Sequence, residues 1–174
     1  TSDGEYFDGE FESVSTSKAM IDALNAVSVD EMHVTECVLL PDDAKNSMSV
    51  VSASDYVITF EEKCSTEEKS KLLGSVMDFM VQKEIVILKK TKKSEREENI
   101  KPGIMKCELR GDSMYMLLST GSEYNLKPEL VMQALYSFSG IEHNQFHYHI
   151  HRLETYMDSP KGGIMPLYQA GTSF

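Results

Sequence analysis

Residues 55–82 read DYVITFEEKCSTEEKSKLLGSVMDFMVQ and hold the clearest structural signal in the chain. Tyr56, Ile58 and Phe60 alternate with other residues, which predicts a strand with one apolar face. Ser65 is a good N-cap, and the two glutamates that follow it suit the first turn of a helix. The helix predicted from this start has one apolar stripe, made of Leu72, Leu73, Val76, Phe79 and Met80.

Further elements follow this strand and helix. Strands are expected at 84–93 and 145–157, a hairpin at 102–121 with its turn at Gly111-Asp112, and a helix at 126–138. The resulting order is strand, helix, strands, helix, strand. Split β-α-β units around an antiparallel sheet produce this order, as in ferredoxin-like folds.

The beginning of the chain shows only part of that order. A strand is expected at 5–12, a helix at 15–27, and a second strand at 32–41, which Pro41 closes. We therefore expect an α+β fold of two split β-α-β, ferredoxin-like halves with antiparallel sheets, the first half being incomplete because its front would lie before Thr1. The expected divisions are an incomplete half at 1–41, a linker at 42–54, a complete half at 55–158 and an irregular tail at 159–174.

Composition sets the class of protein. The 174 residues are 41% hydrophobic and 26% charged, which is ordinary for a soluble globular protein. No apolar run approaches the roughly 18 to 20 residues that span a bilayer, so no membrane partner is expected. Three widely spaced cysteines argue against a disulfide framework and for a reducing compartment, hence a cytoplasmic location.

One basic segment interrupts an acidic chain. The net charge is −11, yet residues 83–106 hold eight Lys or Arg against four Glu. Within them the stretch 89–103, KKTKKSEREENIKPG, offers Lys92, Lys93 and Lys101 as cations that can converge on phosphate. The alternative is that a lysine-rich edge only prevents sheets from pairing with one another.

The stretch 119–135, STGSEYNLKPELVMQAL, combines good helix-start chemistry with one misplaced charge. Asn125 is the predicted N-cap and Pro128 suits a first helical turn. Lys127 opposes the helix dipole, and beside the free N–H groups of a helix start it suits an anion.

Three histidines alternate at 147, 149 and 151, so on a strand they would share one face. Three imidazoles spaced two residues apart reach one metal ion only with difficulty, which leaves His147 and His149 as weak zinc candidates. A hydrated sheet face is the alternative interpretation, and no metal site is assigned.

Three segments together resemble a known family. They are GEYFDGEF near the start, TKKSEREENIKPGI with its strand, and LLSTGSEYNLKPELVMQAL followed by the strand that carries Arg152. They resemble the radical SAM-linked domain of unknown function 2344 over about residues 4–157, without the N-terminal portion of that family. Position by position, the resemblance points to Thr91, Lys92, Lys93, Lys101, Pro102, Gly121, Ser122, Asn125, Lys127, Pro128 and Arg152.

The resemblance also implies a partner. Family members are fused to, or encoded beside, radical SAM proteins, and their gene neighbourhood suggests work on RNA or the ribosome. The three cysteines of this chain lack the spacing of an iron–sulfur cluster loop. The cluster and S-adenosylmethionine are therefore expected on the partner, and no cofactor is expected in this chain.

Three functional hypotheses remain open at this point. The first is an accessory domain that recognises RNA or another anionic group for a radical SAM protein. The second is a protein-interaction or structural module with no ligand of its own. The third is a free-standing enzyme, which would be supported by zinc bound through His147 and His149. The first requires Lys92, Lys93, Lys101, Lys127 and Arg152 to converge in space.

Overall fold

The computed structural model describes residues 1–90, 95–122 and 124–174. Helices α1 (Ser17–Asn25) and α2 (Ser47–Val50) precede a larger unit of strands and two longer helices. That unit and the end of the chain contain the following elements: β1 (Val51–Phe60), α3 (Thr66–Val81), β2 (Val86–Lys90), β3 (Glu95–Asn99), β4 (Ile104–Arg110), β5 (Ser113–Ser119), α4 (Pro128–Phe138), β6 (Tyr148–Asp158) and β7 (Ile164–Pro166), with short 3-10 turns at Lys101–Gly103 and Leu167–Ala170.

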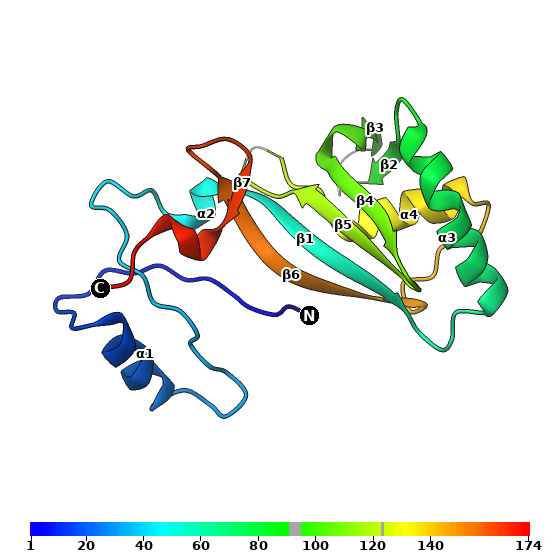
Figure 1. The fold of residues 1–174 in the computed structure, drawn as a ribbon. Coiled ribbons are helices and arrows are strands. Elements are labelled where there is room, and N and C mark those ends of the chain that lie inside the picture. The colour runs from blue at the N-terminus through cyan, green and yellow to red at the C-terminus, as the bar shows by residue number, and fades with distance from the viewer. Residues whose placement is uncertain (91–94, 123) are drawn as a thin grey trace.

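The main sheet has five strands in the order β4-β5-β1-β6-β7, and all its neighbours are antiparallel (Figure 1). Strands β2 and β3 form a separate antiparallel pair. Helix α3 leads from β1 toward β4, and β5 lies between those two strands in the sheet. Helix α4 leads from β5 to β6, and β1 lies between them. The prediction of an α+β fold with antiparallel sheets is confirmed.

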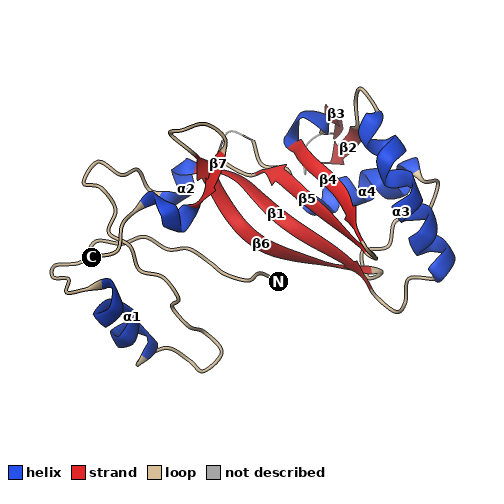
Figure 2. Ribbon diagram, in the orientation of Figure 1, coloured by secondary structure: helices blue, strands red, loops and turns tan. Residues whose placement is uncertain are grey.

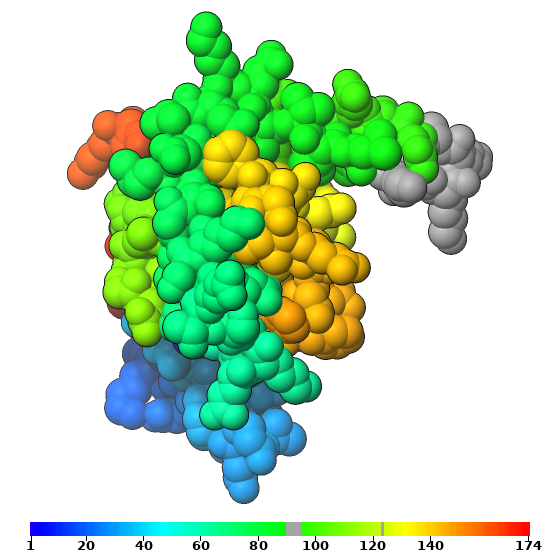
Figure 3. Space-filling model, turned by 90° about the vertical axis from the view of Figure 1, so that its right-hand side faces the viewer, coloured from blue at the N-terminus to red at the C-terminus, as the bar shows by residue number. Residues whose placement is uncertain are grey.

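The core lies between the main sheet and helices α3 and α4 (Figure 2). Figure 3 shows α3 and α4 side by side on one face of the molecule. The largest fully buried side chains are Tyr136, Phe79, Ile58, Leu72 and Ile100. The apolar faces predicted for 55–60 and 66–81 therefore point at each other, which is the reason this unit folds.

The elements predicted at residues 55–82 and in the segments that follow them are largely confirmed. Ser65 caps α3, since its Oγ accepts a hydrogen bond from the backbone N–H of Glu68 at 3.1 Å. The β4–β5 hairpin turns at Gly111, which has a φ of 59° that favours glycine. Strand β1 begins at Val51, so the prediction of a linker through residue 54 is wrong for its last four residues. Strand β3 was not predicted, because all five of its side chains are charged or amide and show no apolar alternation.

The first 50 residues differ most from expectation. Helix α1 forms as predicted, with Thr16 as its cap, but none of its nine residues, all of them described, is buried. The strands predicted at 5–12 and 32–41 are wrong, since neither of these fully described segments forms one. Isolated bridges join Ser2 to Arg152 and Leu39 to Thr172. An alternating pattern becomes a strand only where a neighbouring edge supplies hydrogen bonds along its length.

The tail was predicted to be irregular, and this prediction is wrong for 164–170. Strand β7 pairs with the end of β6, with Met165 opposite Met157. Leu167, in the 3-10 turn that follows, is buried. Pro166 fits because β7 lies at the end of the sheet order, where a missing N–H costs little.

Candidate functional site

The basic stretch 89–103 contacts the C-terminal end of α3 through Lys101. The ammonium group of Lys101 donates a hydrogen bond to the backbone carbonyl of Met80, in the last turn of the helix. A cation there satisfies a free carbonyl and complements the helix dipole. Lys101 is thus partly committed to structure. Lys92 and Lys93 lie outside the described residues.

The two segments singled out by their sequences meet in space. Gly103 is buried, and a Cβ atom added to it would collide with the ring of Tyr124 and lie 3.0 Å from Leu126 Cδ2. A side chain at this position would push Tyr124 and Leu126 away, so glycine favours the close packing of the turn after Lys101 on the loop before α4. This contact places Lys101 and Lys127 on segments that touch.

The start of α4 departs from the prediction. Lys127, not Asn125, is the N-cap residue, and no described side chain caps this helix end by a hydrogen bond. Ser122, Asn125 and Lys127 are exposed. No described residue forms an ion pair with Lys127. We call Lys101, Ser122, Asn125 and Lys127, around the contact of Gly103 with Tyr124 and Leu126, the lysine end.

The remaining basic candidate lies elsewhere in the sheet. Arg152, in β6, forms an ion pair with Glu5 and donates to the carbonyl of Gly4 at 3.3 Å. Hydrogen bonds from Ser2 and Arg152 lower the pKa of Glu5. Among the described residues, no hydrogen bond or ion pair joins Arg152 to Lys101 or Lys127. The structure therefore brings Lys101 and Lys127 onto touching segments and gives Arg152 a different partner.

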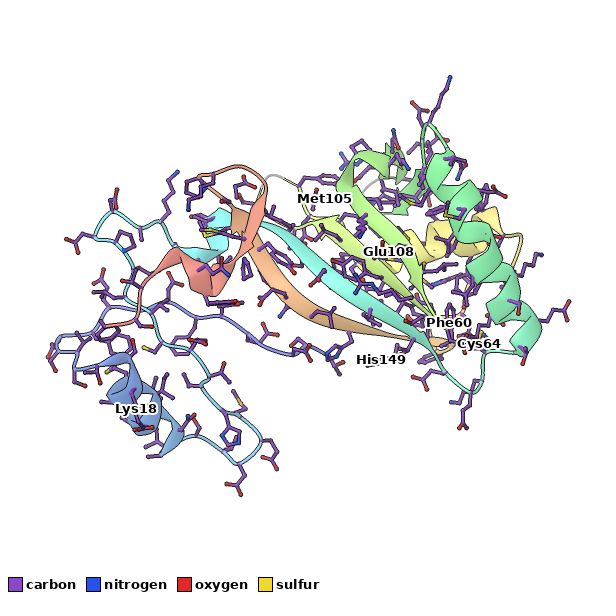
Figure 4. All side chains as sticks on the ribbon, in the orientation of Figure 1. Lys18, Phe60, Cys64, Met105, Glu108 and His149 are labelled. Atoms are coloured by element: carbon purple, nitrogen blue, oxygen red, sulfur yellow. The ribbon has the colours of Figure 1, made fainter. Side chains whose placement is uncertain are left out.

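The three histidines lie in two different places and contact different residues. His147 precedes β6, and its Nδ1 atom lies 2.8 Å from Glu68 Oε1. His149 and His151 both contact the Thr1 hydroxyl, at 2.6 and 2.7 Å. The expectation that all three share one strand face is wrong because the strand starts only at Tyr148. Figure 4 shows His149 well away from Cys64, near which His147 lies.

A second polar cluster lies at the N-terminal end of α3, where Cys64, Glu68 and His147 converge; we call it the Cys64 cluster. One sulfur, one carboxylate oxygen and one imidazole nitrogen all lie within 4.8 Å of one another. Cys64 is buried, and the side chains of Glu68 and His147 are only 15% and 22% exposed. Figure 4 places Cys64 beside Phe60, where β1 ends and α3 begins.

Two further side chains hold the Cys64 cluster in place. The Tyr136 hydroxyl, from α4, donates to Glu68 Oε1 at 3.0 Å. Asn144 accepts the backbone N–H of Phe146 through Oδ1, which leaves its Nδ2 to donate to His147 Nε2 at 2.9 Å. Nδ1 of His147 then carries the proton and donates it to Glu68. The cluster draws on residues from both helices and from the loop before β6.

Titration in the Cys64 cluster follows from burial and these bonds. Burial, followed by the charge of Glu68, raises the pKa of Cys64 to about 11. Burial alone would raise the pKa of Glu68, but hydrogen bonds from His147 and Tyr136 outweigh it and lower that pKa. Burial, then the bond to Glu68, raises the pKa of Tyr136 as well. Without a ligand, the cluster therefore holds a neutral thiol beside a charged carboxylate.

Another buried carboxylate, Asp55 in β1, has its hydrogen bonds satisfied. It accepts bonds from the hydroxyls of Tyr115 and Tyr156 and from the backbone N–H of Glu154, at 3.0, 3.2 and 2.8 Å. The Arg110 guanidinium lies 3.6 Å from the ring centre of Tyr115. These contacts join four strands across the sheet, β4, β5, β1 and β6. We interpret Asp55 as a structural residue.

The comparisons with known proteins identify a family and no activity. A family model described as an uncharacterised protein conserved in bacteria (DUF2344) matches residues 1–128. The chain belongs to this family, DUF2344. No curated protein and no solved structure matches the chain significantly. The DUF2344 match contains Lys101, Lys127, Cys64 and Glu68, and it ends before His147 and Arg152.

The structure also adds residues that the sequence interpretation of this DUF2344 protein missed. Cys64 and Glu68 are four residues apart at a helix start, a spacing that brings side chains together. That spacing was available in the sequence, but the third member, His147, comes from 79 residues further along. Among the helices of the described residues, none has the length and apolarity needed to cross a membrane.

Proposed function

We propose that this chain is an accessory domain that binds the phosphates of single-stranded RNA at the lysine end for a radical SAM partner. The contact of Gly103 with Tyr124 and Leu126 carries this proposal. It joins two of the three segments on which the family resemblance rests, and these two segments carry Lys101 and Lys127. The radical SAM partner is proposed from that resemblance.

The charges around the lysine end favour Lys127 as the binding cation. Lys89 and Arg96 are occupied, since both lie within 3.2 Å of Glu98 Oε2. Lys127 is exposed at the start of α4, where Pro128 has no N–H and the Leu130 N–H donates to the Lys127 carbonyl at 3.0 Å. A phosphate there would therefore meet Lys127 and the backbone N–H of Glu129. On a chain of net charge −11, such a site would attract anions only locally.

The chemistry of a radical SAM reaction would take place on the partner. Cys37, Cys64 and Cys107 are free and come from three separate parts of the chain, unlike the clustered thiolates that hold an iron–sulfur cluster. We propose a cytoplasmic location on the same ground, since free thiols persist in reducing compartments. The strand order β4-β5-β1-β6, with a helix in each crossover, supports a ferredoxin-like half at 55–158.

The RNA proposal is tested by charge reversal. Labelled single-stranded RNA is titrated with the chain at low salt and followed by fluorescence anisotropy. Lys127→Glu should weaken binding at least about 10-fold, because it replaces an attraction of about 1 kcal/mol with a repulsion of similar size. Lys63→Glu makes the same charge change at an exposed site near the other end of α3 and should leave binding unchanged.

Two results would overturn the RNA proposal. One is wild-type chain that shows no salt-sensitive RNA binding at low salt. The other is an equal loss in the Lys127→Glu and Lys63→Glu variants, because binding would then follow net charge and not the lysine end.

A protein-interaction module is the second candidate function. Helices α3 and α4 cover one face of the main sheet (Figure 2), and on the other face Val57 and Leu117 remain partly exposed. A partner that still binds after Lys127→Glu, and is lost when acidic surface residues are neutralised, would favour this function over RNA binding.

A further inference from the structure

The geometry points to a zinc site formed by Cys64, Glu68 and His147. This inference is independent of the lysine end, which lies toward the other end of α3. The three ligand atoms already lie within 4.8 Å of one another. His147 Nδ1 and Glu68 Oε1, now 2.8 Å apart, would have to move slightly apart to admit an ion, and small movements would then give the bond lengths of about 2.0 to 2.3 Å that zinc requires.

The kinds of ligand select the metal. A thiolate and an imidazole favour zinc over magnesium or calcium, which prefer oxygen ligands. Three protein ligands leave one position of a tetrahedral zinc site for water or for a ligand from outside the chain. The same ion would neutralise the charged carboxylate and the thiolate in a partly buried place, where unpaired charges are costly.

The fold positions each ligand separately. Cys64 lies just before Ser65, the extended N-cap of α3, and Glu68 is the third residue of the helix, so the fold of the chain at this cap brings the thiol close to the carboxylate. The loop between α4 and β6 brings His147 over this turn, and its carbonyl accepts the backbone N–H of Glu61 at 3.0 Å. The Tyr136 hydroxyl donates to Oε1 of Glu68, and Oε2 lies 3.1 Å from His147 Nδ1, the nitrogen that would bind the same ion. The supporting bonds thus orient the ligands without depending on a metal.

Metal binding requires a defined exchange of protons. Zinc takes the place of the thiol proton of Cys64, which is released to solvent. At His147, zinc replaces the proton on Nδ1, and the neutral ring then carries its proton on Nε2. Nε2 then needs an acceptor, so the Asn144 amide must turn to present Oδ1 in place of Nδ2, and in doing so it gives up the hydrogen bond that Oδ1 accepts from the Phe146 N–H. Asn144 would then orient the metal-bound imidazole, as the outer partner of a zinc-ligating histidine commonly does.

A catalytic cysteine–histidine pair fits the same cluster less well. The Cys64 thiol donates weakly to the carbonyl of Ser65 at 3.8 Å, and among the described contacts no hydrogen bond joins it to His147. An activated nucleophile needs the thiolate to be favoured by its surroundings. Here the negative charge of the Glu68 carboxylate disfavours the thiolate of Cys64. A bound cation would offset that repulsion.

The test uses the purified chain, freed of metal with a chelator and then titrated with Zn²⁺ against a competing indicator. We expect one zinc ion per chain. Cys64→Ser and His147→Gln, which keep size and hydrogen-bonding capacity, should each lose stoichiometric binding. Cys107→Ser and His149→Gln remove the same groups from β4 and β6 and should bind as wild type does.

Two further measurements separate a metal site from a purely hydrogen-bonded cluster. Co²⁺ in place of Zn²⁺ should give a thiolate-to-metal charge-transfer band that disappears in Cys64→Ser and persists in Cys107→Ser. Asn144→Asp should raise zinc affinity by about 10-fold or more, because a carboxylate accepts the Nε2 proton without turning.

Circular dichroism confirms that each variant is folded before titration. Less than stoichiometric zinc in the folded wild-type chain would overturn the site and leave a hydrogen-bonded cluster only. Undiminished binding in Cys64→Ser would overturn the ligand set. Loss of RNA binding in Lys127→Glu with zinc binding intact would show that the two proposals are separate.

Discussion

Two glutamates, Glu68 and Glu98, are equally exposed at 15% and have very different partners. Glu98, in the hairpin after α3, lies between two permanent cations, Lys89 and Arg96. Glu68, at the start of α3, lies among a histidine, a tyrosine and a cysteine. In the folded chain the first carboxylate is neutralised by two cations that do not exchange their protons near neutral pH. The second is held by groups that can exchange their protons, so it can take part in chemistry that Glu98 cannot.

The largest effect is expected near the C-terminal end of α3, the helix that links these two regions. Phe79 is 1% exposed and packs on Phe138 with ring centres 5.7 Å apart. Phe79→Ala should lower the free energy of unfolding by about 3–5 kcal/mol, through lost burial and a cavity. Chemical denaturation measures this loss. Met77→Ala, at a 68% exposed position of the same helix, is the matched control, and a comparable loss there would contradict the assigned helix face.

A smaller difference should separate the two glutamates themselves. Glu68→Ala leaves Tyr136 and His147 without their partner in a partly buried place, which should cost about 1–3 kcal/mol. Glu98→Ala should cost about 1 kcal/mol or less, because Lys89 and Arg96 can return to solvent. Denaturation of both variants in metal-free buffer makes the comparison. Equal losses would show that the two sites do not differ in the way proposed.

The smallest effect is a change in pH dependence. The folded-state pKa of Glu68 lies below its ordinary value, so its contribution to stability is fully present above about pH 4.5 and is lost as the pH falls through the folded pKa. Below about pH 4.5, wild-type stability should therefore fall more steeply than that of Glu68→Gln. Unfolding curves at several pH values, without metal, measure how the free energy of unfolding of each protein depends on pH. An equal pH dependence in the two proteins would mean that the folded chain does not stabilise the charged form of Glu68.

Local patterns predicted the elements of the main unit well, and the failures share one cause. The start of α3, with its cap and apolar stripe, depends on residues within one or two turns of each other, and it was predicted in detail. The strands at 5–12 and 32–41 were predicted from the same kind of pattern and do not form. A strand depends on a neighbouring edge, and no pattern within the strand itself reports whether that edge exists.

For the candidate sites as well, local features could be predicted and contacts between distant segments could not. Lys101 and Lys127 could be named from the sequence because a basic run and a cation at a helix start are local features. Their proximity could not be deduced, since it depends on the packing of Gly103 against Tyr124 and Leu126. The zinc ligands were missed for the same reason, although Cys64 and Glu68 lie only four residues apart on either side of the Ser65 cap.

The sequence by itself determined the class of fold, the positions of α3, α4 and most strands of the main sheet, and the charge contrast between residues 83–106 and the rest of the chain. These follow from side-chain periodicity and composition, which act over a few residues. Only the tertiary structure decided that Arg152 pairs with Glu5, that His147 leaves the other histidines, and that it meets Cys64 and Glu68. Contacts between residues about 80 to 150 positions apart form only when the sheet and helices close around the core, so no local pattern specifies them.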